Sequence, residues 1–325
     1  MALRAWTIGV DFGGTNIKVG AVTERGVVAR HVVLATREHG VLEAFVLGVD
    51  DAIRRLAKTL GFSAGQIRGV GVGAPGLIDG ERGVIHRLVN VPGGWRGVAL
   101  KRILERRLGC RCEVDNDVNV VALGEWRAGA GRGTRQSMYL TLGTGVGGGV
   151  VANGALVRGA SGSAGEIGHT VILPDGPRCA CGARGCLEAL IGTPAIARRA
   201  RAAIRRGSRT LARLAAREGA VTPVVVSRAA AAGDRAARRI WEETGGYLGL
   251  ALSNLINLLN PERIVLGGGV ARAWPWFAPR MRLTIRRTAF GVPARACRVV
   301  RSALGDEAGI IGGAILVWEQ GVKRR

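Results

Sequence analysis

The sequence predicts an α/β protein made of two similar domains, and three observations carry this prediction. Strand-like apolar runs alternate along the chain with segments of helical apolar spacing. Two strand-like runs joined by a glycine-rich turn occur twice, at residues 7–22 and 138–157. The 325 residues, 47% of them apolar, are enough for two domains of ordinary size. We therefore expect two related α/β domains facing a cleft.

The first half predicts a β-hairpin followed by helices and strands in alternation. Apolar runs at 5–10 and 17–22 flank a glycine pair, which is typical of a hairpin. A third strand is expected at 27–34, and residues 42–60 carry apolar side chains at helical spacing up to Gly61. The other elements expected in this half are a strand at 68–73, a helix at 100–108 and a strand at 111–114.

The second half repeats the hairpin and ends in a helix. Its expected elements are, in order, a strand at 137–142, a glycine turn at 143–149, a strand at 150–157, a helix at 248–259, a strand at 263–266 and a helix at 308–318. Asn260-Pro261 marks the end of the helix before it, because proline cannot continue a helix.

The chain is strongly basic, with 47 Lys and Arg residues against 24 Asp and Glu residues and a formal net charge of +23. Only four of the basic residues are lysines, and the arginines are spread over the whole chain. The densest runs, 198–213 and 228–239, alternate with alanine in a helical pattern. Two interpretations stay open: a solvated arginine-rich helix surface, or a surface for an anionic partner such as a phosphate-rich substrate.

No segment predicts a membrane or secreted protein. The best apolar candidate, residues 247–259, is interrupted by Ser253, Asn254 and Asn257, so it is a poor membrane span. The N-terminal residues lack the basic, apolar and small-residue succession of a signal peptide. We expect a cytoplasmic protein without a membrane partner, whose clustered cysteines bind metal rather than form disulfides.

Three glycine-rich loops follow expected strands. They are Asp11-Phe12-Gly13-Gly14-Thr15, Gly143-Thr144-Gly145 with the glycines up to 149, and Gly267-Gly268-Gly269. Without a Cβ, glycine lets backbone amides approach a phosphate. Any one of these loops is equally typical of a plain turn, and neither hairpin loop has the ending of a P-loop. Together they favour a nucleotide site, in which Asp11 would suit a Mg²⁺ ion or its waters.

Carboxylates follow the strand expected at 111–114. Asp115-Asn116-Asp117 would lie at a strand end that opens on the cleft, which is a suitable place for a general base. The same residue types are preferred at helix N-caps, so the residues alone leave both interpretations open.

The strongest local signal is a group of one histidine and three cysteines: His169, Cys179, Cys181 and Cys186. They match a common structural zinc set with no position left for a water ligand. The alternative is a reduced, buried cysteine cluster. Glu166 and Glu188 flank the group, so a bound ion would also fix two carboxylates.

Together these residues resemble the ROK family of sugar kinases and related repressors, over nearly the whole chain. The segments that carry the resemblance are Asp11 to Thr15, Gly73-Ala74-Pro75-Gly76-Leu77-Ile78-Asp79, Asn90-Val91-Pro92-Gly93-Gly94-Trp95, Asn116-Asp117-Val118-Asn119, Gly165-Glu166-Ile167-Gly168-His169 and the cysteine segment up to Glu188. Val118 stands where the family more often has alanine. The resemblance favours Asp117 as a base over its role as a cap.

The resemblance implies two actin-like, ribonuclease H-like α/β domains around a central cleft. The smaller domain would comprise residues 1–117 with a returning helix in 304–325, and the larger domain, with the zinc loop, residues 118–303. Asp117 would accept the proton of a sugar 6-hydroxyl that attacks the γ-phosphate of ATP, which carries Mg²⁺. The residues implied for the sugar are Gly76, Asn90, Asn116, Asp117, Glu166, His169 and Glu188. Those implied for the nucleotide are Asp11, Gly13, Gly14, Thr15, Gly143, Thr144, Gly145, Gly267, Gly268 and Gly269.

The leading hypothesis is therefore an ATP-dependent glucokinase that forms a dimer or tetramer. N-acetylmannosamine, fructose, mannose or allose stay open as acceptors, and polyphosphate as donor. A sugar-responsive repressor is the alternative of another class, but we expect no room for a DNA-binding module before Asp11 and hence no specific nucleic-acid partner. Loss of zinc is expected to weaken sugar binding more than ATP binding, because the glycine loops lie elsewhere in the chain.

Overall fold

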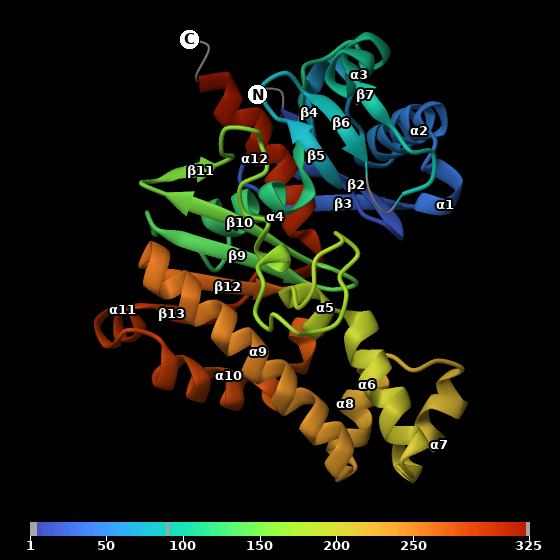
Figure 1. The fold of residues 1–325 in the computed structure, drawn as a ribbon. Coiled ribbons are helices and arrows are strands. Elements are labelled where there is room, and N and C mark those ends of the chain that lie inside the picture. Colours follow the sequence, from blue (N-terminus) through green and yellow to red (C-terminus); the bar gives the residue numbers. More distant parts are fainter. Residues whose placement is uncertain (1–4, 89–90, 323–325) are drawn as a thin grey trace. The chain divides into compact units, whose positions relative to one another are not determined.

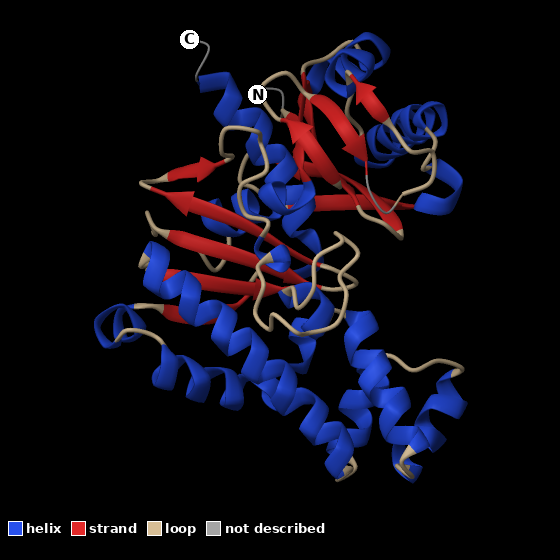
Figure 2. Cartoon of the chain, viewed as in Figure 1, coloured by secondary structure: helices blue, strands red, loops and turns tan. Residues whose placement is uncertain are grey.

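The computed structural model describes residues 5–88 and 91–322, and the chain divides into two compact units. Unit 1 comprises residues 1–135, 149–165 and 302–325, and unit 2 comprises residues 136–148 and 166–301. Two mixed five-stranded sheets with attached helices form the framework (Figures 1 and 2). This confirms the expected α/β class, while the expected domain boundaries stay a prediction.

The first sheet belongs to unit 1 and has the strand order β3-β2-β1-β4-β8. Its strands are β3 (Val28–Ala35), β2 (Asn16–Thr23), β1 (Trp6–Phe12), β4 (Ile67–Ala74) and β8 (Cys112–Asn116). β1 and β2 form the expected hairpin, whereas β1, β4 and β8 run parallel. Asp11 is in register with Gly73, and Gly73 with Asp115, so three strand ends with their following loops meet at one edge.

Among its described residues, unit 1 contains five α-helices that contact this sheet and two short 3₁₀ helices. They are α1 (Thr36–His39), α2 (Leu42–Leu60), η1 (Ala64–Gln66), α3 (Leu100–Leu108), α4 (Asp117–Arg127), η4 (Gly305–Glu307) and α12 (Ala308–Val322). α12 lies directly on the sheet because glycines remove side chains between them. A Cβ on Gly9 would collide with the carbonyl of Ile310, and one on Gly71 with the carbonyl of Gly313.

A small third sheet in unit 1 was not expected from the sequence. It consists of β5 (Gly76–Asp79), β6 (Val84–Leu88) and β7 (Arg96–Val98) in antiparallel order. Strands of three to five residues carry too few alternations to show a period of two.

The second sheet has the order β11-β10-β9-β12-β13. Its strands are β11 (Ala155–Val157), β10 (Val146–Ala152), β9 (Ser137–Leu142), β12 (Arg263–Gly267) and β13 (Arg298–Arg301). The expected turn at 143–149 and strand at 150–157 are wrong in their bounds. β10 already begins at Val146, and the chain turns at Asn153 and Gly154, both of which have positive φ.

The remaining helices belong to unit 2. They are η2 (Ile167–His169), α5 (Leu187–Ile191), α6 (Thr193–Arg205), α7 (Arg209–Glu218), α8 (Pro223–Ala231), α9 (Arg235–Leu259), η3 (Val270–Ala273), α10 (Trp274–Thr288) and α11 (Gly291–Ala296). α9 runs beside α10 (Figure 1) and is longer than expected, since Asp234 caps an arginine-rich first half. Among the described residues, no helix is both long and apolar enough to span a membrane.

Candidate active site and metal centre

The loop from Asp11 to Thr15 joins β1 to β2 and is held from within unit 1. Gly13 donates its N–H to the carbonyl of Asn16 at 3.0 Å. The buried Thr36 donates its hydroxyl to the carbonyl of Gly13 at 2.8 Å and its N–H to that of Thr15 at 3.0 Å. Gly14 and Thr15 remain exposed, so the loop is fixed on one side and accessible on the other.

Asp11 faces Lys18 across the hairpin, a pairing that is not among the contacts expected from the sequence. The Lys18 Nζ lies 4.0 Å from Oδ2 of Asp11 and donates a hydrogen bond to the carbonyl of Asp306 at 3.0 Å. Burial raises the pKa of Asp11, and the ammonium group of Lys18 acts in the opposite direction. The register of a hairpin closed at residues 13–16 would have been enough to find this pair.

Asp117 is the first residue of α4, directly after β8. The N-cap role belongs to Asn116, whose Oδ1 accepts the N–H groups of Val118 at 2.9 Å and Asn119 at 3.2 Å. The Nδ2 of Asn116 donates to the carbonyl of Gly76 at 3.2 Å. The structure thus brings together Gly76, Asn116 and Asp117, and it assigns the cap and the candidate base to neighbouring residues.

Asp115 is buried behind these residues and is held by Arg158. The Nε of Arg158 donates a hydrogen bond to Oδ2 of Asp115 at 2.8 Å. The Nη2 of Arg158 lies 2.7 Å from the same oxygen. The other oxygen, Oδ1, accepts the backbone N–H of Asn116 at 2.8 Å and Nδ2 of Asn119 at 3.2 Å. This network fixes the strand end next to Asp117. No local pattern in the sequence points to Arg158, which lies 43 residues from its partner.

Two glycine loops of unit 2 lie at one edge of the second sheet. Gly267 on β12 is in parallel register with Thr141 on β9, so the loops after these strands are neighbours. Thr193 holds the first loop, because its N–H and its hydroxyl both donate to the carbonyl of Gly143, at 2.9 and 3.0 Å. Gly268 has φ +85 and packs on Leu142. The loops predicted to bind a nucleotide therefore adjoin in this unit.

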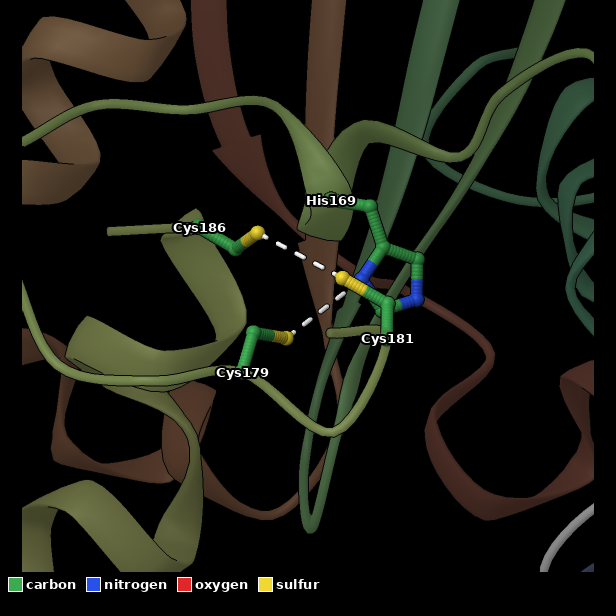
Figure 3. A group of neighbouring side chains, drawn as sticks. All are labelled: His169, Cys179, Cys181 and Cys186. Carbon is green, nitrogen blue, oxygen red and sulfur yellow. Dashed lines mark hydrogen bonds between the residues drawn. The ribbon is translucent and has the colours of Figure 1, made fainter. Parts of the chain in front are cut away.

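The histidine and the three cysteines converge on one point of unit 2 (Figure 3). One ligand atom from each of His169, Cys179, Cys181 and Cys186 lies within 4.8 Å of all the others. The Sγ of Cys179 is 3.6 Å from Nδ1 of His169, and the Sγ atoms of Cys181 and Cys186 are 3.7 Å apart. Tetrahedral zinc, with Zn–S of about 2.3 Å and Zn–N of about 2.0 Å, requires ligand separations of roughly 3.5–3.8 Å. The cluster fits such an ion.

The thiols differ in their environments. Burial raises the pKa of Cys179, and it raises the pKa of Cys186 to about 12. A hydrogen bond with the backbone of Ala183 lowers the pKa of the exposed Cys181. Since a metal ion binds thiolates, its binding must displace protons from the two buried thiols, and acid should weaken it.

Glu188 connects this cluster to the loop after β9. Its Oε2 accepts the N–H of Val146 at 3.0 Å, and its Oε1 lies 3.9 Å from Sγ of Cys179. A Cβ on Gly145 would lie 2.5 Å from Oε2. The expectation that loss of zinc weakens sugar binding more than ATP binding depends on the separation of the two loops along the chain. The structure contradicts that reason, because the two loops are in contact.

The other predicted site residues are placed as follows. Glu166 immediately precedes η2, is 59% exposed, and has Oε2 4.0 Å from Nε2 of His169. His169 therefore directs Nδ1 toward the thiols and Nε2 toward the carboxylate. Asn90 lies outside the described residues.

Strand-end glycine loops, a carboxylate at a helix start and a Cys₃His cluster place the chain among two-domain kinases of the sugar-kinase type and their relatives. The ROK family model matches residues 7–320, and the chain belongs to the ROK family.

Individual relatives extend the match over nearly the full length. The glucokinase of Halalkalibacterium halodurans is 38% identical over 97% of this chain and 96% of its own. The crystal structure of a ROK glucokinase from Streptomyces griseus, in complex with glucose and AMPPNP, is 33% identical, covers 97% of this chain and 100% of its own, and superposes with a TM-score of 0.83. The N-acetylglucosamine repressor of Escherichia coli O157:H7 is 32% identical over 87% of this chain, but over 66% of its own length.

Proposed function

We propose that the protein transfers the γ-phosphoryl group of ATP to the 6-hydroxyl of a hexose, with glucose as the acceptor. The observation that carries this proposal is the end-to-end similarity to a glucokinase that binds glucose and AMPPNP. The position of Asp117 supports it, because a half-buried carboxylate at the start of a helix is suited to take a proton from a bound hydroxyl.

Asp117 would act as the general base. As the sugar oxygen bonds to the γ-phosphorus, its proton passes to the Asp117 carboxylate and the bond from the phosphorus to ADP breaks. Asn116 would contact the sugar while its Oδ1 caps α4, and Asp115 with Arg158 would hold both residues in place. Phosphoryl transfer depends mostly on such alignment, since it needs little covalent help.

Backbone amides would neutralise the phosphates. The glycines of the Asp11–Thr15 loop and of the Gly143–Gly145 loop leave room for close approach, and Thr15 and Thr144 add hydroxyl donors. Asp11 would hold the waters of the Mg²⁺ ion that accompanies ATP, and a nearby cation would favour its ionised form. The glycines at 267–269 would lie near the nucleoside.

The cysteine cluster would hold one structural Zn²⁺ ion. With four protein ligands the ion has no open position, so it supplies rigidity rather than an activated water. Its ligands fix the segment from Glu166 to Glu188, and we propose that Glu166, His169 and Glu188 contact sugar hydroxyls. Gly76 and Asn90 would complete the sugar contacts.

A phosphorylation assay tests the proposal. With ATP as the donor, ADP formation would be coupled to an optical signal. With polyphosphate as the donor, the sugar phosphate would be measured directly. Each donor would be tested with glucose, N-acetylmannosamine, fructose, mannose and allose. We expect the highest kcat/KM for glucose with ATP. Another preferred sugar or donor would correct the substrate, and no transfer to any sugar would refute the kinase assignment.

A sugar-responsive repressor is the second candidate, supported by the net charge of +23 and the similarity to a repressor. The same assay separates the two, because a repressor would bind sugar without phosphorylating it. Assembly into a dimer or tetramer stays a prediction, which light scattering would test.

A further inference from the structure

A small cavity in unit 2 is surrounded by arginine side chains. It has a volume of about 270 Å³ and lies between α6 and the first turns of α9. The arginines that line it are Arg199 and Arg206 from the α6 side and Arg235 and Arg239 from α9. Glu243 is the only acidic residue in the lining.

Three of these guanidinium groups have no side-chain partner in the part of the chain that the structure describes. Within residues 5–88 and 91–322, Arg206, Arg235 and Arg239 make no side-chain hydrogen bond or ion pair. Unpaired surface arginines are common, but three that line one cavity repel one another unless an anion lies between them. Glu243 does not offset them, because its Oε2 already lies 3.4 Å from Nη1 of Arg199.

Arg199 forms the inner wall of the cavity and is incompletely satisfied. Its Nη2 donates to the carbonyl of Leu190 at 2.9 Å and to the hydroxyl of Thr244 at 3.0 Å. Its Nε is buried and has no hydrogen-bond partner in the described part of the chain. Burial lowers the pKa of Arg199 by disfavouring its charged form, and Glu243 acts in the opposite direction.

We propose that this cavity is a binding site for a compact anion that carries two phosphoryl groups. Guanidinium groups match phosphate oxygens in pairs, which makes arginine the preferred side chain for such ligands. The three unpaired charges complement an inorganic diphosphate, and the volume of about 270 Å³ excludes a macromolecule. A bisphosphorylated hexose offers the same chemistry, so the test includes both sources. The site is separate from the residues of the proposed kinase function and does not depend on them.

Calorimetry on the full chain tests the site in a phosphate-free buffer. Inorganic pyrophosphate or a hexose 1,6-bisphosphate is titrated in the presence of saturating AMPPNP and glucose, which would fill the proposed active site. We expect one binding event for at least one probe, and the tighter probe identifies the source. Arg235→Gln with Arg239→Gln should weaken it by at least about tenfold, since two charged hydrogen-bonding groups are lost. Both side chains are exposed and have no partner among the described residues, so the melting temperature of this double variant should be unchanged.

The matched control is Arg213→Gln with Arg286→Gln. Both residues lie in unit 2, outside the cavity lining. They are exposed and make no side-chain pair with any residue in 5–88 or 91–322, so this variant loses the same charge elsewhere. The affinity of this control variant for the probe should change by less than about twofold, because only screened long-range charge is lost. Absence of binding for both probes overturns the proposal, and equal weakening in the two double variants overturns it as well, since binding would then reflect net charge alone. The comparison between variants holds whether or not the protein proves to be a kinase.

Discussion

The carboxylate of Glu188 accepts a hydrogen bond from the backbone N–H of Val146 at 3.0 Å. Val146 follows the loop proposed to bind phosphate, and Glu188 stands two residues after Cys186 of the metal cluster. The same carboxylate is proposed to contact the sugar. One side chain thus links the Cys₃His cluster to the proposed sugar contacts and the proposed phosphate loop, so a disturbance of one should reach the other two.

Loss of the metal ion should therefore weaken the binding of both substrates, glucose and ATP. Cys181→Ser removes one exposed ligand, and we expect the KM values for glucose and ATP to rise together because Glu188 loses its support. The melting temperature should fall by at least about 4 °C, since structural zinc contributes to folding. Metal analysis, melting curves and steady-state kinetics check this. Cys297→Ser, a thiol outside the cluster, is the control; full activity without stoichiometric zinc would refute the site.

Gly145→Ala should destabilise the same junction. The new Cβ would lie 2.5 Å from Oε2 of Glu188, so the carboxylate or the loop must move. Because Oε2 is the end of a flexible side chain, the carboxylate can turn away and lose its hydrogen bond to Val146, so we expect a loss of about 0.5–1.5 kcal/mol in the free energy of unfolding and a higher KM for glucose. Gly143→Ala is the matched control, because its Cβ would meet no atom within 4 Å. Urea unfolding curves compare the two variants, and equal stabilities would contradict the close approach.

Asp117→Asn should abolish phosphorylation while sugar binding persists. Asparagine keeps the shape and hydrogen-bonding capacity of the side chain but cannot take the proton, so kcat should fall by at least about 10²–10⁴-fold. Asp51→Asn, an exposed position on α2, is the control and should remain active. The coupled assay measures turnover, and calorimetry with glucose measures binding. Near-normal turnover of a folded Asp117→Asn variant would remove Asp117 from the mechanism.

Arg158→Gln should reduce both stability and turnover. It leaves the Asp115 carboxylate, 2% exposed, without its charged partner. Removing one member of a buried pair costs about 3–5 kcal/mol, and the 25% exposure of Arg158 reduces this to an expected ~2–3 kcal/mol. Arg68→Gln breaks the exposed pair with Glu24 and should cost less than about 1 kcal/mol. Chemical denaturation distinguishes them, and equal losses would show that Asp115 needs no partner.

Binding to DNA should be non-specific. The net charge of +23 would release counterions from any duplex, so affinity should fall steeply with salt and should not depend on sequence. Fluorescence anisotropy with two unrelated duplexes at rising salt measures this. A sequence-selective complex that survives about 200 mM salt would favour the repressor hypothesis.

Local signals in the sequence account for much of the fold. The helix at 42–60 has the bounds expected, because its end depends on Gly61, which adopts φ +71 as a C-cap. The hairpin at the start of the chain likewise depends on its own glycines. The bounds expected for the second hairpin are wrong, because the glycines at 147–149 resemble a turn in the sequence but lie within strand β10. One of them, Gly149, leaves room for Ala122 on α4, a distant contact that the local pattern does not encode.

The candidate site was predictable where residues cluster along the chain, as in the cysteine segment. It was not predictable where side chains meet across long separations. Arg158 reaches Asp115 over 43 residues, and Glu188 reaches Val146 over 42. Such pairs depend on the order of strands in each sheet, which periodicity does not reveal.

The close packing of α12 on the first sheet has a consequence for synthesis on the ribosome. Val22 of β2 shares a core with Ile310 and Ala314, and Gly9 of β1 packs on the backbone of Ile310, so both strands need residues that are translated about 300 residues later. Unit 2 consists mostly of the intervening residues 166–301, so its side chains are all available earlier. Unit 2 can therefore fold first. Until α12 is synthesised, the apolar face of the N-terminal strands stays exposed to solvent. During that interval the nascent chain is most exposed to aggregation, and chaperones would act on unit 1.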